Sequence, residues 1–303
     1  MTMTPIPPVP VTPARRLGLD LAVIGIMWRR EMLRYRRDRS QIFGAISRTV
    51  LWLLILGFGL GAALREIEGY AYQQYILPGV ITLNILFSSL QCAIALVWDR
   101  EVGLLRSVIV SPASMLSVTL GKVLGGATIS LLQGAIPLLL IPFLGLQVTL
   151  SGLAFALVVM FFMGLSITAG GIILAARLKS FEGFGAISNG LIQPLYFLSG
   201  SIFPLKGVIG GVGFLDIPMA LRDELRRLGI FAIGGGWVVQ LPFWIEILVY
   251  LNPVSYMLDL LRFMLLGFEQ LPLWADLTVT FGLPLLLIPL AAWQVKSMLN
   301  RRS

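Results

Sequence analysis

Charged residues concentrate between two apolar stretches in the segment from Asp99 to Arg106. The residues of interest there are Asp99, Arg100, Glu101, Gly103, Leu104, Leu105 and Arg106, with Pro112 shortly after them. A short helix of this composition, broken at the proline, exposes charges and leucines together, which suits docking into a groove on another protein. The alternative is an ordinary turn whose charges lie among lipid headgroups, and the residues alone favour that turn.

Enzyme chemistry finds little support in the sequence. There is no histidine, so the commonest metal ligand and the usual proton shuttle are missing. A loop that cradles the phosphates of ATP needs the pattern G-x-x-x-x-G-K-[ST]. Around Gly121 that pattern fails, because Leu116 stands in place of the first glycine and Val123 in place of the hydroxyl residue. We therefore predict no catalytic residue, cofactor or metal in this chain, and we expect Lys122 to lie near headgroups.

Two pairs of residues have spacings typical of helix contacts, one within a helix and one between helices. Asp259 and Arg262 stand one turn apart on a candidate helix, so we expect them to form an ion pair with each other on the outer side of a membrane. Gly121 and Gly125 are spaced by four residues, which permits close contact between membrane helices.

Composition identifies the class of protein that holds these residues. Of the 303 residues, 57% are hydrophobic and 13% are charged, and the mean hydropathy is +0.89. A soluble domain is nearer half apolar and one quarter charged. The net charge of +8 does not indicate nucleic-acid binding, because the basic residues flank apolar runs. The sequence predicts a multi-pass membrane protein of the cell (inner) membrane, in contact with the lipid bilayer.

The predicted fold is all-α, with six transmembrane helices. The expected spans are 42–64, 76–97, 118–144, 150–176, 186–205 and 277–295. With both termini on the cytoplasmic side, 17 basic residues fall inside and 6 outside, which satisfies the positive-inside rule. The segment 206–276 mixes glycines, charges and two interrupted apolar pieces. We expect it to be an outer-side insertion with re-entrant or interfacial helices, because charges inside a membrane are costly; two added spans are the alternative.

An amphipathic helix is predicted ahead of the first span. Residues 1–16 are rich in Pro and Thr toward their start and are expected to be a disordered tail. From 17 to 37, apolar residues recur at spacings of three and four, which predicts a helix lying in the cytoplasmic membrane interface. The residues expected to act on this interface helix are Trp28, Arg29, Arg30, Arg36 and Arg37.

The order of several motifs resembles a known family. The motifs are Tyr75-Ile-Leu-Pro-Gly-Val-Ile-Thr82, Asp99-Arg-Glu-x-Gly-x-Leu-Arg106, Leu120-Gly-Lys-x-Leu-Gly-Gly126, Phe197-Leu-Ser-Gly-Ser-Ile-Phe-Pro204 and Asn252-Pro-Val-Ser-Tyr-Met-Leu-Asp259. Together they resemble the ABC-2 type transporter permeases, in the style of the daunorubicin-resistance and nodulation-export permeases. The segment 206–240 departs from that family, because it is longer than such permeases usually carry.

The resemblance implies a membrane subunit of an ATP-binding cassette exporter within 17–303. Two copies would form a homodimer, and each would dock a separate cytoplasmic ATPase subunit that binds the ATP. The segment 98–114 would then be the coupling segment, and the substrate would be lipophilic, a lipid or a glycan. Two alternatives of other classes remain: an ion-gradient-driven secondary transporter, and a membrane-embedded lipid-modifying enzyme.

Overall fold

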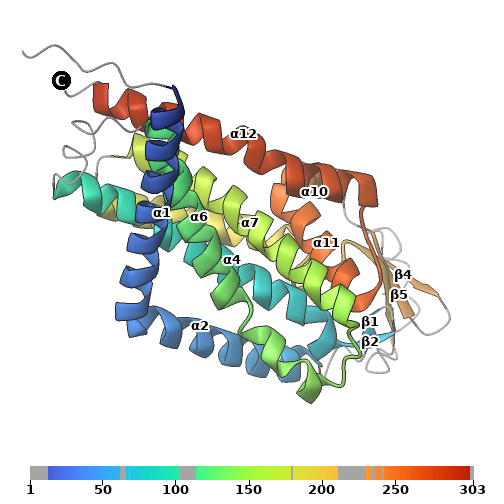
Figure 1. The fold of residues 1–303 in the computed structure, drawn as a ribbon. Coiled ribbons are helices and arrows are strands. Elements are labelled where there is room, and N and C mark those ends of the chain that lie inside the picture. Colours follow the sequence, from blue (N-terminus) through green and yellow to red (C-terminus); the bar gives the residue numbers. More distant parts are fainter. Residues whose placement is uncertain are drawn as a thin grey trace, which may run out of the picture.

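The chain folds into a mostly helical bundle with a small sheet at one end (Figure 1). The structure, a computed structural model, describes residues 13–61, 66–67, 69–102, 114–178, 180–210, 230–233, 236–240 and 242–300. Of the predicted sites, Gly103, Leu104, Leu105, Arg106 and Pro112 lie outside the described residues. So do residues 1–12 of the predicted tail. The first helix begins at Pro13, within the stretch that was predicted to be disordered.

The helices follow one another along the bundle. They are α1 (Pro13–Arg37), α2 (Arg39–Trp52), the π-helix η1 (Leu53–Leu60), α4 (Tyr72–Glu101), α6 (Met115–Gly134), the 3₁₀ turns η2 (Pro137–Leu140) and η3 (Pro142–Leu144), α7 (Leu150–Arg177), α8 (Phe181–Phe197), α10 (Phe243–Leu251), α11 (Pro253–Leu266) and α12 (Leu273–Asn300). We call the end where α4 finishes and α6 begins the basic end, and the opposite end the sheet end (Figure 1).

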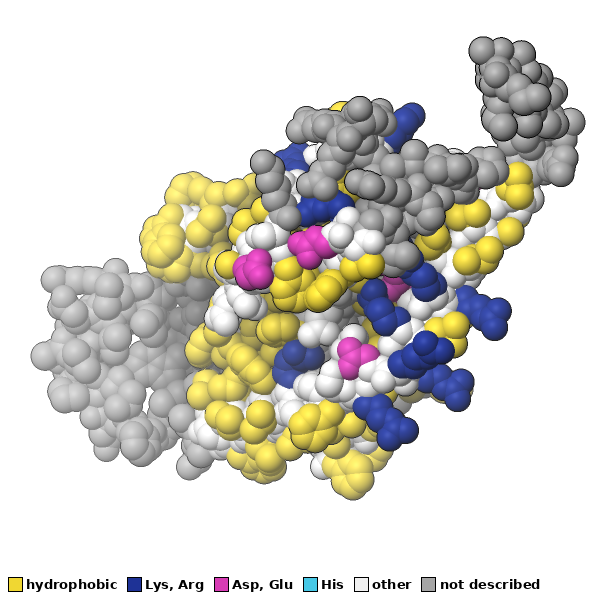
Figure 2. Space-filling view, turned by 90° about the vertical axis from the view of Figure 1, so that its left-hand side faces the viewer, with side chains coloured by type: hydrophobic (Ala, Val, Ile, Leu, Met, Phe, Trp, Pro, Cys, Tyr) yellow, Lys and Arg dark blue, Asp and Glu magenta, His cyan; other side chains and the backbone are white. Residues whose placement is uncertain are grey.

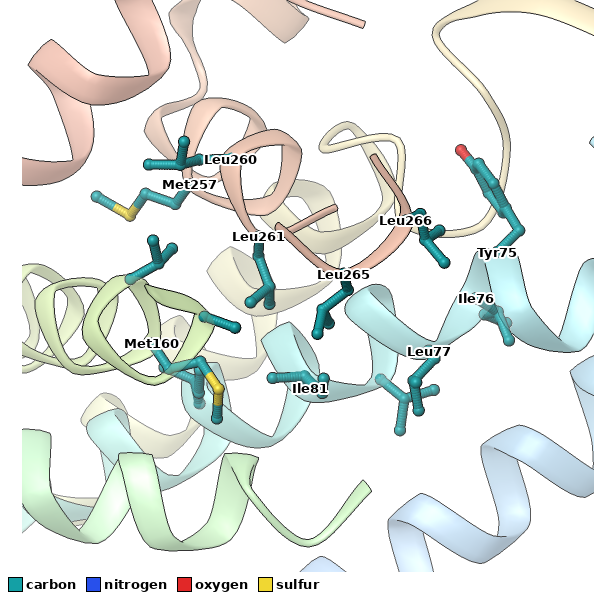
Figure 3. Packing of buried hydrophobic residues seen from close by; sticks show 14 of the residues in the cluster. Tyr75, Ile76, Leu77, Ile81, Met160, Met257, Leu260, Leu261, Leu265 and Leu266 are labelled. Carbon is teal, nitrogen blue, oxygen red and sulfur yellow. The ribbon is translucent and has the colours of Figure 1, made fainter. Parts of the chain in front are cut away.

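The helix α4 is the centre of the bundle. Most of its length is buried, whereas α2 with η1 and α12 are buried over only about a quarter of theirs. At the sheet end, its residues Tyr75, Leu77 and Ile81 pack against Met160 of α7 and Leu261 of α11 (Figure 3). The outer helices keep large apolar side chains exposed, which is the surface that lipid tails would cover.

Five of the six predicted spans coincide with helices that are long and apolar enough to cross a membrane. They are Arg39–Leu60, Tyr72–Glu101, Met115–Leu144, Leu150–Arg177 and Leu273–Met298. In the third of these, Pro137 and Pro142 each begin a 3₁₀ turn, because proline cannot donate the backbone hydrogen bond that an α-helix needs. The prediction of a fifth span at 186–205 was wrong in extent, since α8 ends at Phe197 and has 17 residues.

The chain after α8 turns inside the protein instead of continuing as a helix. Ser199 donates its hydroxyl to the Tyr196 carbonyl at 2.6 Å, and Gly200 takes a φ of +78°. The carbonyl of Gly200 accepts from two side chains, with Tyr75 Oη at 2.9 Å and Arg262 Nη2 at 2.7 Å from its oxygen. Irregular backbone at membrane depth is stable only where protein groups satisfy it, and here they do.

The all-α prediction missed an antiparallel sheet. Its strand order is β2-β1-β3-β5-β4, from β1 (Glu66–Ile67), β2 (Tyr70–Ala71), β3 (Lys206–Gly210), β4 (Ile230–Ile233) and β5 (Gly236–Gln240). The pairing of β3 with β5 runs from Lys206 opposite Gln240 to Gly210 opposite Gly236. Glycine is depleted in strands, so these glycine-rich stretches gave no strand pattern in the sequence. The sheet joins the loop before α4 to the predicted insertion.

The later part of the insertion forms two helices at a sharp angle. The helices α10 and α11 meet at a bend of 81° around Asn252 and Pro253, so they are either one broken span or a re-entrant loop. The side-chain amide of Asn252 donates to the Leu195 carbonyl at 2.7 Å, which ties the bend to α8. With this pair counted as one span, the described helices include six that could cross a membrane.

The turn at Gly200 gives a stability prediction. In Gly200→Ala, the new Cβ would lie 2.7 Å from Leu205 Cγ and would need a left-handed backbone, so we expect a loss of about 1–3 kcal/mol. Gly185→Ala in α8 meets nothing within 4 Å and serves as the control, which should be as stable as the wild type or slightly more. Thermal unfolding in detergent measures both, and equal midpoints for the two variants would contradict the structure.

Candidate functional site

The basic end of the bundle carries a dense array of charge. Figure 2 shows lysine and arginine side chains gathered over this face, with a few carboxylates among them. The arginines of α1 supply many of the positive charges. The carboxylates of Glu31 and Asp99 are buried among the helices. Within the described residues, no group of three or more histidines, cysteines or carboxylates is placed to hold a metal ion. Ion pairs are the charged contacts that the structure shows at this end.

Five of these side chains form a cluster between three helices. Lys122 of α6 lies at the centre, with its Nζ 2.5 Å from Asp99 Oδ2 and 3.3 Å from Glu31 Oε1. Arg30 also pairs with Asp99, and the guanidinium of Arg34 lies 2.8 Å from Glu31 Oε2. We call Arg30, Glu31, Arg34, Asp99 and Lys122 the ion cluster. It connects α1, the end of α4 and the start of α6.

The three central members of the ion cluster are buried. Glu31 is 2% exposed, Lys122 6% and Asp99 7%. A buried charge is costly unless it is paired, and removal of one partner leaves another charge without compensation. Burial lowers the pKa of the Arg30 guanidinium, but the carboxylates of Asp99 and Glu31 outweigh this effect and raise the pKa above its ordinary value. Arg30 therefore stays charged.

Close packing holds α1 against α6 beside the ion cluster. A Cβ at Gly121 would lie 2.7 Å from the Met27 Cβ, and one at Gly125 would lie 2.8 Å from the Glu31 Cβ. The helices can approach this far only because both positions lack a side chain. The glycine pair singled out in the sequence is therefore used within the chain. Its place is the contact between α1 and α6.

Hydrogen bonds extend this contact in both directions. Trp28 Nε1 donates to Thr128 Oγ1 at 3.1 Å. At the start of α6, Asp20 Oδ1 accepts from the Ser114 backbone N–H at 3.1 Å and from Ser117 Oγ at 2.6 Å. The helix α1 thus lies beside α6 over several turns.

The structure divides the predicted coupling residues into those that contact other helices and those that are exposed. Asp99 points into the ion cluster, and Arg100 Nη1 donates to the Leu178 carbonyl at 2.6 Å, at the end of α7. Glu101 is exposed, and so is Val102. Within the described part of the segment, Asp99 and Arg100 hold helices together, whereas Glu101 faces outward.

The predicted interface-helix residues divide in the same way. Trp28 and Arg30 contact α6 and α4, while Arg29, Arg36 and Arg37 are exposed. Among the described residues, the coupling segment and the interface helix meet through the pair Arg30 and Asp99 and through the hydrogen bond from the Ser114 backbone N–H to Asp20. Arg29, Arg36 and Arg37 stay at the surface.

The pair Asp259 and Arg262 belongs to the sheet end, far from the ion cluster. Arg262 Nη1 lies 3.1 Å from Asp259 Oδ1, and both side chains are almost fully buried. The other carboxylate oxygen of Asp259 accepts from the backbone N–H groups of Gln270 and Leu271, at 2.7 Å each. The guanidinium also stacks 4.7 Å from the ring of Tyr75. These contacts hold α4, α11 and the turn after α8 together.

Sequence reasoning missed Glu31, Arg34 and Lys122 as members of a site. We expected Lys122 near headgroups, but it is buried because two carboxylates neutralise it. Glu31 carried a usable indication, since it is the one acidic residue among the arginines of the stretch 29–37. A single carboxylate among several arginines indicates that it pairs with a cation inside the protein.

Comparison with known proteins gives the family context. Residues 22–214 match the family model described as ABC-2 type transporter. The chain is 23% identical over 265 residues to the inner membrane transport permease YadH of Escherichia coli strain K12, covering 84% of this chain and 86% of YadH. It is 25% identical over 220 residues to nodulation protein J of Sinorhizobium fredii, covering 70% of this chain and 82% of that protein.

The ion cluster gives a prediction about its central lysine. Lys122→Met removes the cation between Glu31 and Asp99, so we expect a loss of about 3–5 kcal/mol in unfolding free energy. Lys122→Arg keeps the charge and should recover most of that loss. Thermal unfolding in detergent is the measurement. If Lys122→Met unfolds with the wild-type midpoint, the cluster does not hold the three helices together.

Proposed function

The chain belongs to the ABC-2 type transporter family, and on that premise we propose that it is the membrane subunit of an exporter driven by a separate ATPase. The cargo would be a lipophilic, lipid or glycan-type molecule. The apolar surface of the bundle and its membrane-length helices support transport across a bilayer. The match to an inner membrane permease supports the same membrane for this chain.

The orientation that we propose places the basic end on the cytoplasmic side. The exposed arginines of α1 and the basic side chains at the ends of α7 and α12 lie at that end (Figure 2). Basic residues are retained on the cytoplasmic side of membrane proteins, which supports this assignment. Both termini are then inside, the sheet is outside, and α10 with α11 forms a re-entrant pair on the outer side.

The ion cluster is the observation that carries the proposal. It connects α1, which lies at the surface of the basic end, to α4, the central helix of the bundle. A partner that pushes on α1 or on the end of α4 would move both, because buried ion pairs resist separation. ATP binding and hydrolysis in that partner would drive the bundle between inward-open and outward-open states.

The surface for the ATPase consists of exposed side chains around the ion cluster. Glu101 at the end of α4 is one contact, and the others are Arg29, Arg36 and Arg37 of α1. The coupling segment that follows Glu101 would complete the surface. A second copy of the chain would complete the pathway as a homodimer, with one ATPase for each copy.

Charge reversal at Glu101 tests the ATPase contact. The tagged chain is co-expressed with candidate ATPase subunits, and the retained subunit and its ATP hydrolysis are measured. We expect Glu101→Arg to reduce the retained ATPase at least fivefold, because a contact at that position changes sign. Glu269→Arg makes the same change on an exposed residue at the sheet end and serves as the control. The ATPase contact is wrong if both variants retain the subunit equally.

One observation favours the gradient-driven alternative. Asp276, in the first turn of α12, is fully buried, and among the described residues neither oxygen of its carboxylate has a hydrogen-bond partner. An ionisable residue of this kind within a span is typical of ion-coupled transport.

Neutralisation of Asp276 distinguishes the two modes. If ATP drives transport, Asp276→Asn should keep nucleotide-dependent flux within about twofold, since the carboxylate does not contact the ion cluster. Flux into proteoliposomes is measured with ATP alone and with a proton or sodium gradient alone. Flux that follows the gradient and is lost in Asp276→Asn would replace the exporter with a secondary transporter.

A further inference from the structure

Arg48 lies within a candidate span, and the described residues supply no acidic partner for it. It lies nine residues after Arg39, about 13 Å along the helix axis of α2. Lys122 and Arg262 are paired with carboxylates, but no carboxylate of the described residues lies within ion-pair distance of Arg48. A charge inside a membrane span is costly and marks a functional site unless it is neutralised. Arg48 therefore calls for an anion that the described residues do not supply.

The neighbours of Arg48 orient its guanidinium without neutralising it. Its Nε donates to Asn84 Oδ1 at 2.8 Å, and its guanidinium carbon lies 4.3 Å from the ring centre of Phe87. Asn84 is fully buried and donates its amide to Thr49 Oγ1 at 2.8 Å, so its oxygen faces Arg48. Among the described residues, the two Nη atoms of Arg48 have no hydrogen-bond partner. These atoms supply the paired donors that match phosphate oxygens.

A pocket lies at the basic end, beside the ion cluster. Its volume is about 460 Å³, and its lining is mostly apolar, with Ile94, Trp98 and Phe181 beside the amides of Gln41 and Gln91. Arg34 and Asp99, which are paired within the ion cluster, also line it. It lies between α1, α2, α4 and α8.

The spacing of residues relates the pocket to Arg48. Gln41 precedes Arg48 by seven residues on α2, and Gln91 follows Asn84 by seven residues on α4. Seven residues are two turns, so each pair shares one helix face. The contact line between α2 and α4 therefore runs from Gln41 and Gln91 in the pocket to Arg48 and Asn84. An elongated molecule in the pocket would meet amides first and the guanidinium beyond them.

We propose that Arg48 binds the phosphate headgroup of an amphiphile that enters through this pocket, which makes Arg48 a specificity-determining residue of the transport pathway. The apolar lining of the pocket accepts the hydrocarbon part, and the guanidinium accepts the anion. The inference rests on the proposed function for its role in transport, but the binding site itself does not. A bilayer phospholipid and a transported amphiphile share this headgroup chemistry.

Lipid binding to the purified full-length chain tests the site. The chain in neutral detergent is titrated with phosphatidylglycerol, and bound lipid is counted by native mass spectrometry. We expect Arg48→Gln to weaken the binding at least tenfold. Arg48→Lys should weaken it less, because the positive charge remains although the paired donors of the guanidinium are lost. Lys296→Gln removes one exposed positive charge at the same end and should change the binding less than twofold. Equal binding by Arg48→Gln and Lys296→Gln would overturn the proposal.

A second variant guards against misfolding of Arg48→Gln. Gln91→Trp leaves Arg48 unchanged and fills part of the pocket, so it should also weaken phosphatidylglycerol binding while the thermal midpoint stays unchanged. Phosphatidylcholine, whose phosphate is balanced by a choline cation, should bind weakly to the wild type and respond little to any of these variants. A pocket variant that binds phosphatidylglycerol like the wild type would contradict the proposed route.

A transport measurement distinguishes a bound bilayer phospholipid from a transported amphiphile. It also tests the Arg48 site independently of the exporter assignment. The complex with its ATPase is placed in vesicles, and ATP-driven movement of a fluorescent phosphatidylglycerol between leaflets is measured. Loss of movement in Arg48→Gln supports a transported amphiphile, and retained movement overturns the role of Arg48 in transport. If even the wild type shows no ATP-driven flux while Arg48-dependent binding persists, the exporter assignment fails and the binding site stands.

Discussion

A charge that is removed from water must be matched by another charge, and this constraint organises both ends of the bundle. At the basic end, Lys122 reaches the interior only because Glu31 and Asp99 come from two other helices to meet it. At the sheet end, Arg262 is buried because Asp259, Gln270 and the carbonyl of Gly200 surround it. In each case apolar packing brings the helices together, and the polar groups decide which arrangement is stable.

The span pattern was predictable from the sequence, because long apolar runs have few other uses. Residue periodicity also indicated α1, although the expected apolar stripe is not its most buried face. Glu31 occupies that place, since its carboxylate pairs with Lys122 of α6, which lies far away in the sequence, as well as with Arg30 and Arg34 of α1. A stripe on one helix contains no information about such a partner. The same holds for Lys122, which alone resembles any lysine at a membrane surface.

The errors at the sheet end have a common physical cause. The residues after Phe197 are apolar enough to continue a helix, but the left-handed turn at Gly200 is stabilised by side chains of α4 and α11. In the insertion, β3 likewise pairs with β1, which lies before α4. Tertiary contacts overrode local preference in both places. Asp259 and Arg262 were predictable as a pair because their contact is local, one helical turn apart.

The contact between α1 and α6 has a consequence for how the protein is made. The ribosome delivers α1 first, yet Trp28 must wait for Thr128, and Glu31 must wait for Lys122, 91 residues later in the chain. Until α6 emerges, Glu31 lacks its Lys122 partner, and the face of α1 around Met27 has no helix to pack against. The chain therefore does not fold strictly in order from its N-terminus. The helix α1 docks only after the third long apolar segment has been inserted.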